Sequence, residues 1–143
     1  MDRKEWALLA IAAGGDAGLT PVQLQKSLFL YGKHRPDEVG EDYYRFAPYD
    51  YGPFDAEVYR DAQRLQGAGL VDITSVPGRR WNKYVVSSMG LELAASLKKR
   101  RAVVDIEHLE ALVKWARGLT FSELVRAIYQ LYPEYIANSV FQG

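Results

Sequence analysis

The side chains that most often carry catalysis or metal binding are few or badly spaced in this sequence. It has no cysteine, so cysteine nucleophiles, thiolate metal sites and disulfides are excluded. The two histidines, His34 and His108, stand far apart and belong to no His-Glu-x-x-His or mixed His/Cys motif. The glycines at 14–18 follow no predicted strand and lack the Lys-Ser/Thr of a phosphate-binding loop. We therefore expect neither a metal nor another cofactor.

Carboxylates and serines offer no clearer sign of catalysis. Between Asp37 and Asp61 eight acidic residues stand against two basic ones, a net charge of −6. Two carboxylates could act as acid and base, but nothing in the sequence desolvates a pair together, and a solvated acidic face is favoured. Ser87 and Ser88 lie outside any Gly-x-Ser-x-Gly motif and suit a helix cap better than a nucleophile. The sequence predicts a protein that is not an enzyme.

An aromatic block is the most distinctive feature of the chain. Six of the twelve residues from Tyr43 to Phe54 are aromatic, and prolines and a glycine are interspersed among them. Such rings fill a gap between helices, or they form a partner-binding surface, because tyrosine is favoured at binding hot spots. The second interpretation gives these partner-binding candidates: Tyr49, Tyr51, Gly52, Pro53, Phe54, Asp55, Glu57 and Asp61.

A basic stretch follows the acidic one. From Arg79 to Arg101 seven basic residues stand against one acid, a net charge of +6, although the whole chain is neutral. These side chains either reach nucleic-acid phosphates or are merely solvated. The nucleic-acid-binding candidates are Arg79, Arg80, Lys83, Lys98, Lys99, Arg100 and Arg101.

Capping signals and apolar periodicity predict the elements that position these groups. Capping boxes begin helices at Asp2, Thr20 and Thr120, and Ser87 or Ser88 begins another. The predicted helices cover residues 2–14, 20–33, 55–66, 87–101, 104–116 and 120–132, with a short helix after Pro133. Residues 70–74 and 81–86 are β-prone and joined by a Pro-Gly turn. Residues 35–53 have no sustained period and are expected to be irregular or extended.

The order helix, helix, helix, hairpin is that of a winged helix. The expected fold is therefore mainly α with a β-hairpin, as one domain over residues 1–143: a winged-helix-like core at 1–86 and a packed C-terminal helical extension at 87–143. Two features argue against DNA reading. The third helix would expose a net charge of −1, and the long 35–53 segment replaces the tight turn of a helix-turn-helix.

Composition limits the remaining classes. The chain has 143 residues, 48% of them hydrophobic and 25% charged, which is ordinary for one globular domain. The charged N-terminus does not resemble a secretory signal, and no run approaches a membrane span. A cytoplasmic protein without membrane contact is expected. Rings near the C-terminus leave a homodimer open.

The aromatic block also carries a family resemblance. Its Phe-x-Pro-Tyr-x-Tyr-Gly-Pro-Phe pattern at 46–54 resembles the Panacea, or SocA-like antitoxin, domain family and its YwgA-like relatives. Further segments are similar to that family at 24–30, 58–61, 69–71 and 132–139. The resemblance implies a small bacterial or phage protein that neutralises a toxin by direct contact or adapts it for proteolysis. Tyr49, Tyr51, Gly52, Pro53 and Phe54 match the motif, which assigns them no catalytic role.

Two functions follow as expectations. The first is an antitoxin-like or adaptor-like module that binds a partner protein, such as a toxin or a phage-defence component, through the aromatic block and the acidic third helix. Opposed charge would speed an encounter with a basic partner. The alternative is a winged-helix nucleic-acid-binding or transcription regulatory protein.

Overall fold

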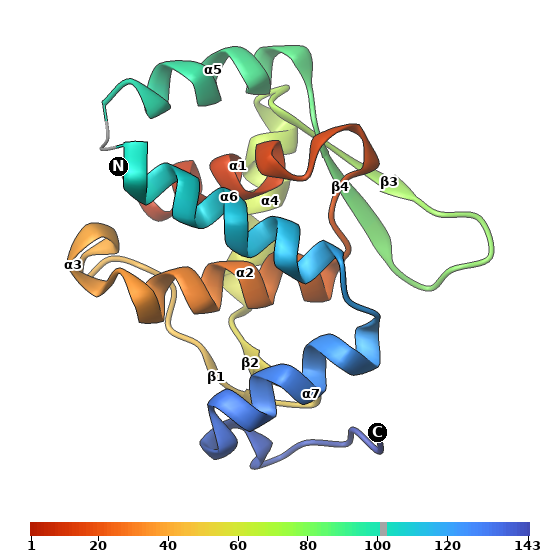
Figure 1. Cartoon of the computed structure of the whole chain (residues 1–143). Coiled ribbons are helices and arrows are strands. Elements are labelled where there is room, and N and C mark those ends of the chain that lie inside the picture. The colour runs from red at the N-terminus through yellow and green to blue at the C-terminus, as the bar shows by residue number, and fades with distance from the viewer. Residues whose placement is uncertain (101–102) are drawn as a thin grey trace.

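Helix α1 (Arg3–Ala13) lies at the centre of the fold (Figure 1). The computed structural model describes residues 1–100 and 103–143. The Asp2 carboxylate accepts a hydrogen bond from the Glu5 backbone, and the Glu5 carboxylate accepts one from the Asp2 backbone, which confirms the expected capping box. All six residues from Trp6 to Ile11 are buried, because other elements pack around every side of this helix.

Helices make up most of the chain, and two antiparallel hairpins complete it, so the fold class is confirmed. The other helices are α2 (Pro21–His34), α3 (Pro36–Val39), α4 (Ala56–Gly67), α5 (Ser88–Lys98), α6 (Val103–Arg117) and α7 (Phe121–Leu131), with the short 3-10 helices η1 (Gly15–Ala17) and η2 (Pro133–Ile136). The strands are β1 (Ala47–Tyr49), β2 (Gly52–Phe54), β3 (Val71–Ser75) and β4 (Asn82–Val86). Helix α5 ends three residues before the expected end at Arg101, which lies outside the described residues.

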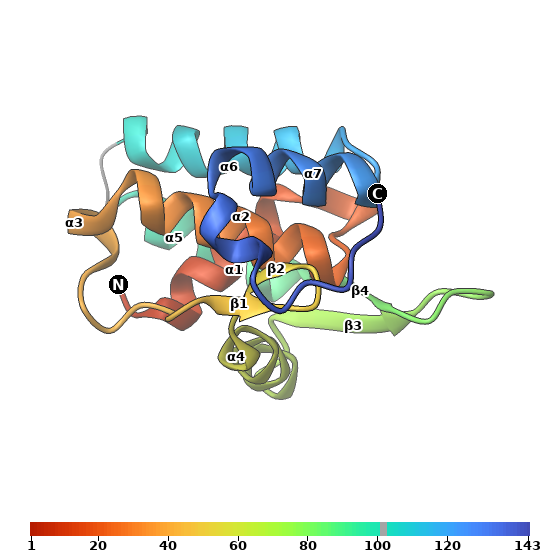
Figure 2. The same cartoon turned by 90° about the horizontal axis from the view of Figure 1, so that it is seen from below.

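The first 86 residues have the order and strand pairing of a winged helix. Helices α1, α2 and α4 precede the hairpin of β3 and β4, the wing, in which Val71 pairs with Val86 and Ser75 with Asn82. Leu19, between α1 and α2, adds an antiparallel bridge to Tyr84 with two backbone hydrogen bonds of 2.9 Å. The loop after α1 thus ties the wing to the helices, while the far end of the wing extends beyond them (Figure 2).

The segment from Arg35 to Pro53 is more regular than expected. It contains the short helix α3 and strand β1, and its last residues begin strand β2. The sequence did not predict these strands because each contains a proline, and proline is rare in sheets. Pro48 and Pro53 are paired with each other across the two strands. The insertion that separates α2 from α4 is therefore a second β-hairpin.

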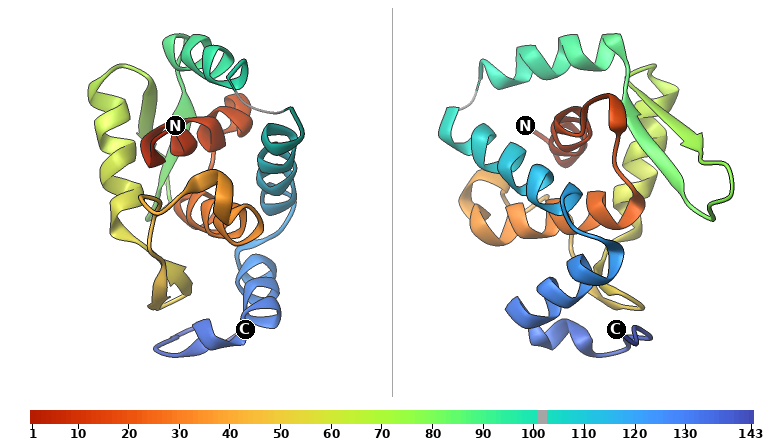
Figure 3. Two further views of the ribbon diagram at one scale, coloured as in Figure 1. Left: turned by 90° about the vertical axis from the view of Figure 1, so that its left-hand side faces the viewer. Right: turned by 45° about the vertical axis from the view of Figure 1, so that its right-hand side comes forward.

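Helices after the wing close the fold on two sides. Helix α6 crosses α1 and α2, and α7 with the C-terminal tail lies at the end of the molecule beside β1 and β2 (Figures 1 and 3). One continuous hydrophobic cluster runs from Trp6 in α1 to Ile128 in α7. Within the described part of the chain, no helix combines the length and the apolar composition of a membrane span.

Candidate partner-binding surface

The β1–β2 hairpin presents the aromatic block. Tyr49 pairs with Gly52, so Asp50 and Tyr51 form the tip. Gly52 has φ of +103°, a conformation that other residues rarely adopt. A Cβ atom at this position would also lie 3.2 Å from the Tyr129 ring of α7. Glycine is therefore required here both for the turn and for the close approach of α7.

Two polar residues of α2 anchor the hairpin from the inside. Lys26 is only 3% exposed, and its Nζ donates a hydrogen bond to the carbonyl oxygen of Pro53 at 3.0 Å. Burial lowers the pKa of Lys26 to about 7. The neighbouring Gln25 side chain donates to the Asp55 carbonyl oxygen and accepts from the Asp55 backbone. The middle of β2 and the residue that follows it are thus held by side chains that the sequence did not single out.

The C-terminal tail holds the tip of the same hairpin. The backbone N–H of Val140 donates to the Asp50 carbonyl oxygen at 2.9 Å. The Ser139 hydroxyl also donates to that oxygen, and it accepts a hydrogen bond from the Tyr129 hydroxyl of α7. These bonds join residues almost ninety positions apart in the chain. The tail thus holds the tip of the hairpin at Asp50, and α7 in turn holds the tail through Tyr129.

What we call the aromatic surface consists of three rings in contact, Tyr51, Phe121 and Phe141, together with Tyr49 of the same hairpin, whose ring packs on Phe54. Tyr49 is 53% exposed, Tyr51 43% and Phe121 45%. The ring centroids of Tyr51 and Phe121 lie 5.0 Å apart, and those of Phe121 and Phe141 6.2 Å. The elements that carry them meet at one end of the molecule (Figure 3). Exposed apolar side chains gathered in this way are typical of interaction sites.

The other motif residues, Gly52, Pro53 and Phe54, lie beneath the exposed rings and pack against the rest of the protein. Gly52 and Pro53 are buried, and Phe54 is half-buried. The Phe54 ring stacks on Tyr49 at 4.9 Å and packs edge-on against Tyr59 of α4 at 5.6 Å. Of the five motif positions predicted as partner contacts, Tyr49 and Tyr51 are the two whose rings are available to one.

The acidic candidates on α4 do not form an exposed face, and that expectation is wrong. Asp61 is 2% exposed, because α4 turns it toward the core. Its carboxylate accepts hydrogen bonds from the Tyr44 hydroxyl at 2.7 Å, from Arg3 at 3.1 Å and from Arg64 at 2.5 Å. Burial and the bond to Asp61 raise the pKa of Tyr44 well above its usual range. Glu57 is paired with Arg3, Arg64 and a third arginine, Arg60.

Asp55 also has a structural task. One carboxylate oxygen accepts from the Glu57 backbone at 2.9 Å and caps α4, and the other accepts from the Arg45 backbone at 2.8 Å. The cap fixes where the hairpin ends and α4 begins. Asp55, Glu57 and Asp61 are therefore better explained by folding than by contact with a basic partner.

The basic candidates are distributed over separate places. Arg79 and Arg80 lie exposed at the end of the wing, where the Arg79 guanidinium stands 5.4 Å from the Trp81 ring centroid. Lys83 is half-buried on the wing. Of the remaining candidates, Arg101 lies outside the described residues. Lys98, Lys99 and Arg100 lie at the end of α5 remote from the wing, and Lys98 pairs with Glu110 at 2.7 Å (Figure 1). They do not form one continuous surface with the wing.

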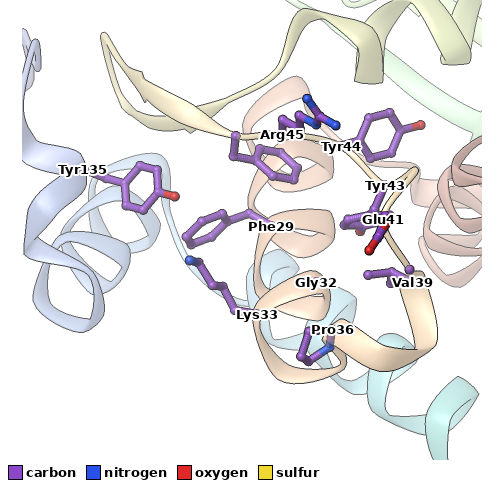
Figure 4. A pocket seen from close by; sticks show the side chains of 12 residues that line it. Phe29, Gly32, Lys33, Pro36, Val39, Glu41, Tyr43, Tyr44, Arg45 and Tyr135 are labelled. Atoms are coloured by element: carbon purple, nitrogen blue, oxygen red, sulfur yellow. The ribbon is translucent and has the colours of Figure 1, made fainter.

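A pocket of about 280 Å³ opens between α2, the loop after α3 and η2 (Figure 4). Phe29, Phe46 and Tyr135 give it aromatic walls. The Lys33 ammonium lies 5.7 Å from the Phe29 centroid and 5.9 Å from that of Tyr135, close enough for cation–π attraction. The volume is slightly below the ~300–1,000 Å³ of most ligand pockets. A pocket of this size is better suited to a single side chain of a partner protein than to a cofactor.

The two histidines, far apart in sequence, meet between α2 and α6. His34 Nδ1 and His108 Nε2 are 2.8 Å apart, and beside them Arg35 pairs with Asp105 at 3.1 Å. Burial, Arg35 and His34 lower the pKa of His108. Over the described ranges, no group of three or more histidines, cysteines and carboxylates is placed to hold a metal ion.

No protein-family model and no curated protein matches this chain. The resemblance to the Panacea family remains a prediction.

Proposed function

We propose that this chain is a non-enzymatic interaction module that binds a partner protein through the aromatic surface, in the manner of an antitoxin or an adaptor. The observation that carries the proposal is the exposure of Tyr49 and Tyr51 on the anchored hairpin and of Phe121 on α7, where the Tyr51 ring packs against Phe121 and Phe121 packs against Phe141. Water contact with clustered rings is unfavourable, and a partner that covers them gains ~25 cal/mol for each Å² of apolar area buried.

Rigidity strengthens this argument. The hairpin is held by Lys26, by the Gln25–Asp55 pair and by the tail at Asp50, so its rings lose little freedom on binding. Tyrosines presented by a stiff loop are the side chains that dominate many binding sites. The carboxylates of α4, by contrast, are used as a cap or in ion pairs, which leaves them without an evident catalytic task.

The class of partner follows from the family resemblance. A toxin or a phage-defence component is the partner it implies, and a cysteine-free chain suits the reducing cytoplasm where such proteins meet. A homodimer stays open as a second use of the same rings. Nucleic-acid binding is a second candidate function, and it concerns another face, formed by α4 and the wing.

The proposal is tested by co-expressing the chain with the product of the adjacent gene in its source genome. We expect the two to co-purify and the chain to suppress any growth arrest that its neighbour causes. Tyr49→Ala/Tyr51→Ala should weaken the complex by at least about 30-fold, because hot-spot residues contribute ~2 kcal/mol or more. Met89→Ala/Leu91→Ala on α5 is the matched control, since it also removes two exposed apolar side chains. Equal loss in both variants, or no complex, would contradict the proposal.

A further inference from the structure

The outward face of α4 has the composition of a base-reading helix. Val58, Ala62 and Leu65 are buried on its inner side, together with Asp61. The opposite side carries exposed Arg60 and Gln63, which lie three residues apart and so share one face. Arg64 and Gln66 are exposed on its two flanks, and Ala56 and Gly67 at its ends are too small to obstruct a ligand.

Beside this face, Asp61 is buried, and the partly exposed Glu57 is paired with arginines that include Arg60. Asp61 is buried beneath Arg3 and Arg64, and its charge is matched there. Glu57 faces Arg3, Arg60 and Arg64, so three guanidinium groups surround one carboxylate. The charge argument against DNA made from the sequence counted Asp55, Glu57 and Asp61 as exposed; because Asp61 is buried, the net charge of −1 no longer describes the exposed side chains of this helix.

The wing stands beside α4 as a second basic element. The Tyr59 ring of α4 and the Tyr84 ring of β4 are stacked, with centroids 6.1 Å apart, which joins the two elements. Tyr84 and Asp72 belong to opposite faces of the wing, because side chains alternate along the paired strands. The wing extends past the helices and ends in Arg79 and Arg80 (Figures 2 and 3).

Acids also lie beside the start of α4, next to Arg3. Glu41, Asp42 and Glu57 line a cavity of about 340 Å³ there, together with Arg3 and Arg45. The long insertion between α2 and α4, the second objection from the sequence, folds as the β1–β2 hairpin at the N-terminal end of α4 and leaves the middle of its outer face exposed. A polyanion would therefore run from Arg60 toward the wing.

We propose that α4 and the wing bind duplex DNA, with Arg60 and Gln63 in the major groove and Arg79 and Arg80 on the phosphate backbone. Arginine pairs with the O6 and N7 atoms of guanine, and glutamine with the N6 and N7 atoms of adenine, both in the major groove. A helix followed by a wing is the arrangement that brings such side chains to the groove and the hairpin to the backbone. This inference rests on the second candidate function given above, and it is separate from partner binding because the aromatic surface lies at another end of the molecule.

Fluorescence anisotropy with a labelled mixed-sequence 30-base-pair duplex tests backbone binding. The affinity of the unaltered chain for the duplex should fall steeply as the salt concentration rises from about 50 to about 300 mM. Over this range the release of counterions from DNA makes binding dependent on salt. Arg79→Ala/Arg80→Ala should weaken binding at low salt and lower the slope of log K against log salt by about 2. Lys114→Ala/Arg117→Ala is the matched control, since it removes two exposed cations from α6 on the opposite side of the molecule (Figure 2).

Selection from a random duplex library tests base reading. We expect enrichment of a short motif, and Arg60→Ala or Gln63→Ala should each reduce discrimination at one or two base pairs by about 5- to 150-fold. Circular dichroism should show each variant folded, because both side chains are exposed. Absence of duplex binding at 50 mM salt, equal loss in the α6 control, or tighter binding to single strands or RNA would overturn the inference. None of these outcomes bears on the aromatic surface.

Discussion

The Lys26 ammonium donates a hydrogen bond of 3.0 Å to the Pro53 carbonyl oxygen inside the protein, and this bond joins helix α2 to the hairpin that displays Tyr49 and Tyr51. An amino group without full hydration is unfavourable as a cation, which is why burial lowers the pKa of Lys26 to about 7. The neutral amine still donates to Pro53. The attachment of the hairpin therefore survives loss of the proton.

Lys26 should make stability rise with pH. The unfolded chain keeps this proton up to the ordinary pKa of 10.5, whereas the folded chain releases it near 7. The unfolded state thus binds more protons between these values, so this contribution is complete above 10.5 and is lost as pH falls toward 7. We expect the free energy of unfolding in urea to rise by up to ~1.4 kcal/mol per pH unit in this range, below the ionisation of tyrosine.

Lys26→Met should abolish that slope and stabilise the protein at neutral pH, because it removes the buried charge. Lys33→Met, at an exposed lysine in the last turn of α2, is the control and should leave the slope unchanged. A wild-type protein whose stability is flat between pH 7 and 9 would show that Lys26 is hydrated.

The histidine pair should weaken the α2–α6 contact in acid. The folded pKa of His108 lies below its ordinary 6.5, so its contribution to stability is complete above 6.5 and is lost as pH falls through the lower folded value. An NMR titration of the imidazole protons should place the His108 midpoint below 6.5. His34→Gln should raise that midpoint, because it removes one of the charges that disfavour His108 protonation. An unchanged midpoint would show that the rings are not paired in solution.

Substitution of Asp61 should reduce folding stability more than substitution of most other polar residues. Asp61→Asn leaves Arg3 and Arg64 without their buried counter-charge. We expect the free energy of unfolding to fall by about 3 kcal/mol, at the low end for a broken buried ion pair, because both arginines still reach water. Glu57→Gln, at a more exposed carboxylate of the same network, should cost less than about 1 kcal/mol. Urea unfolding followed by tryptophan fluorescence measures both, and similar losses would argue that Asp61 is solvated.

Gly52→Ala should damage the hairpin more than an equivalent change in the wing. Both Gly52 and Gly78 have positive φ, so alanine strains either by roughly 1–2 kcal/mol. A Cβ at Gly52 additionally meets the Tyr129 ring at 3.2 Å, whereas one at Gly78 meets nothing within 4 Å. Melting temperatures of the two variants give the comparison, and an equal decrease would contradict the close packing of α7 on the hairpin.

Local signals in the sequence predicted most of the fold. The capping boxes at Asp2, Thr20 and Thr120 begin helices where expected, and the Pro-Gly turn lies between β3 and β4. Such signals act over a few residues, so they need no tertiary information. The β1–β2 hairpin was not predicted, because both of its strands contain proline, which is typical of loops and rare in strands.

The site was harder to predict because tertiary contacts decide it. Asp61 follows Val58 by three residues and so shares its buried face, but its charge made exposure the natural expectation. The contacts of Tyr51 with Phe121 and of His34 with His108 join positions seventy or more residues apart. Nothing local encodes them, and the same holds for Lys26 beneath Pro53.

Hydrogen exchange measured by mass spectrometry on the complex with the neighbouring gene product tests the central proposal most directly. If the aromatic surface binds the partner, peptides covering 47–54, the start of α7 and the C-terminal tail should exchange more slowly in the complex than in the free chain. The wing and the outer face of α4 should be unaffected. Protection confined to α4 and the wing, with unchanged exchange at Tyr49, Tyr51 and Phe121, would contradict it.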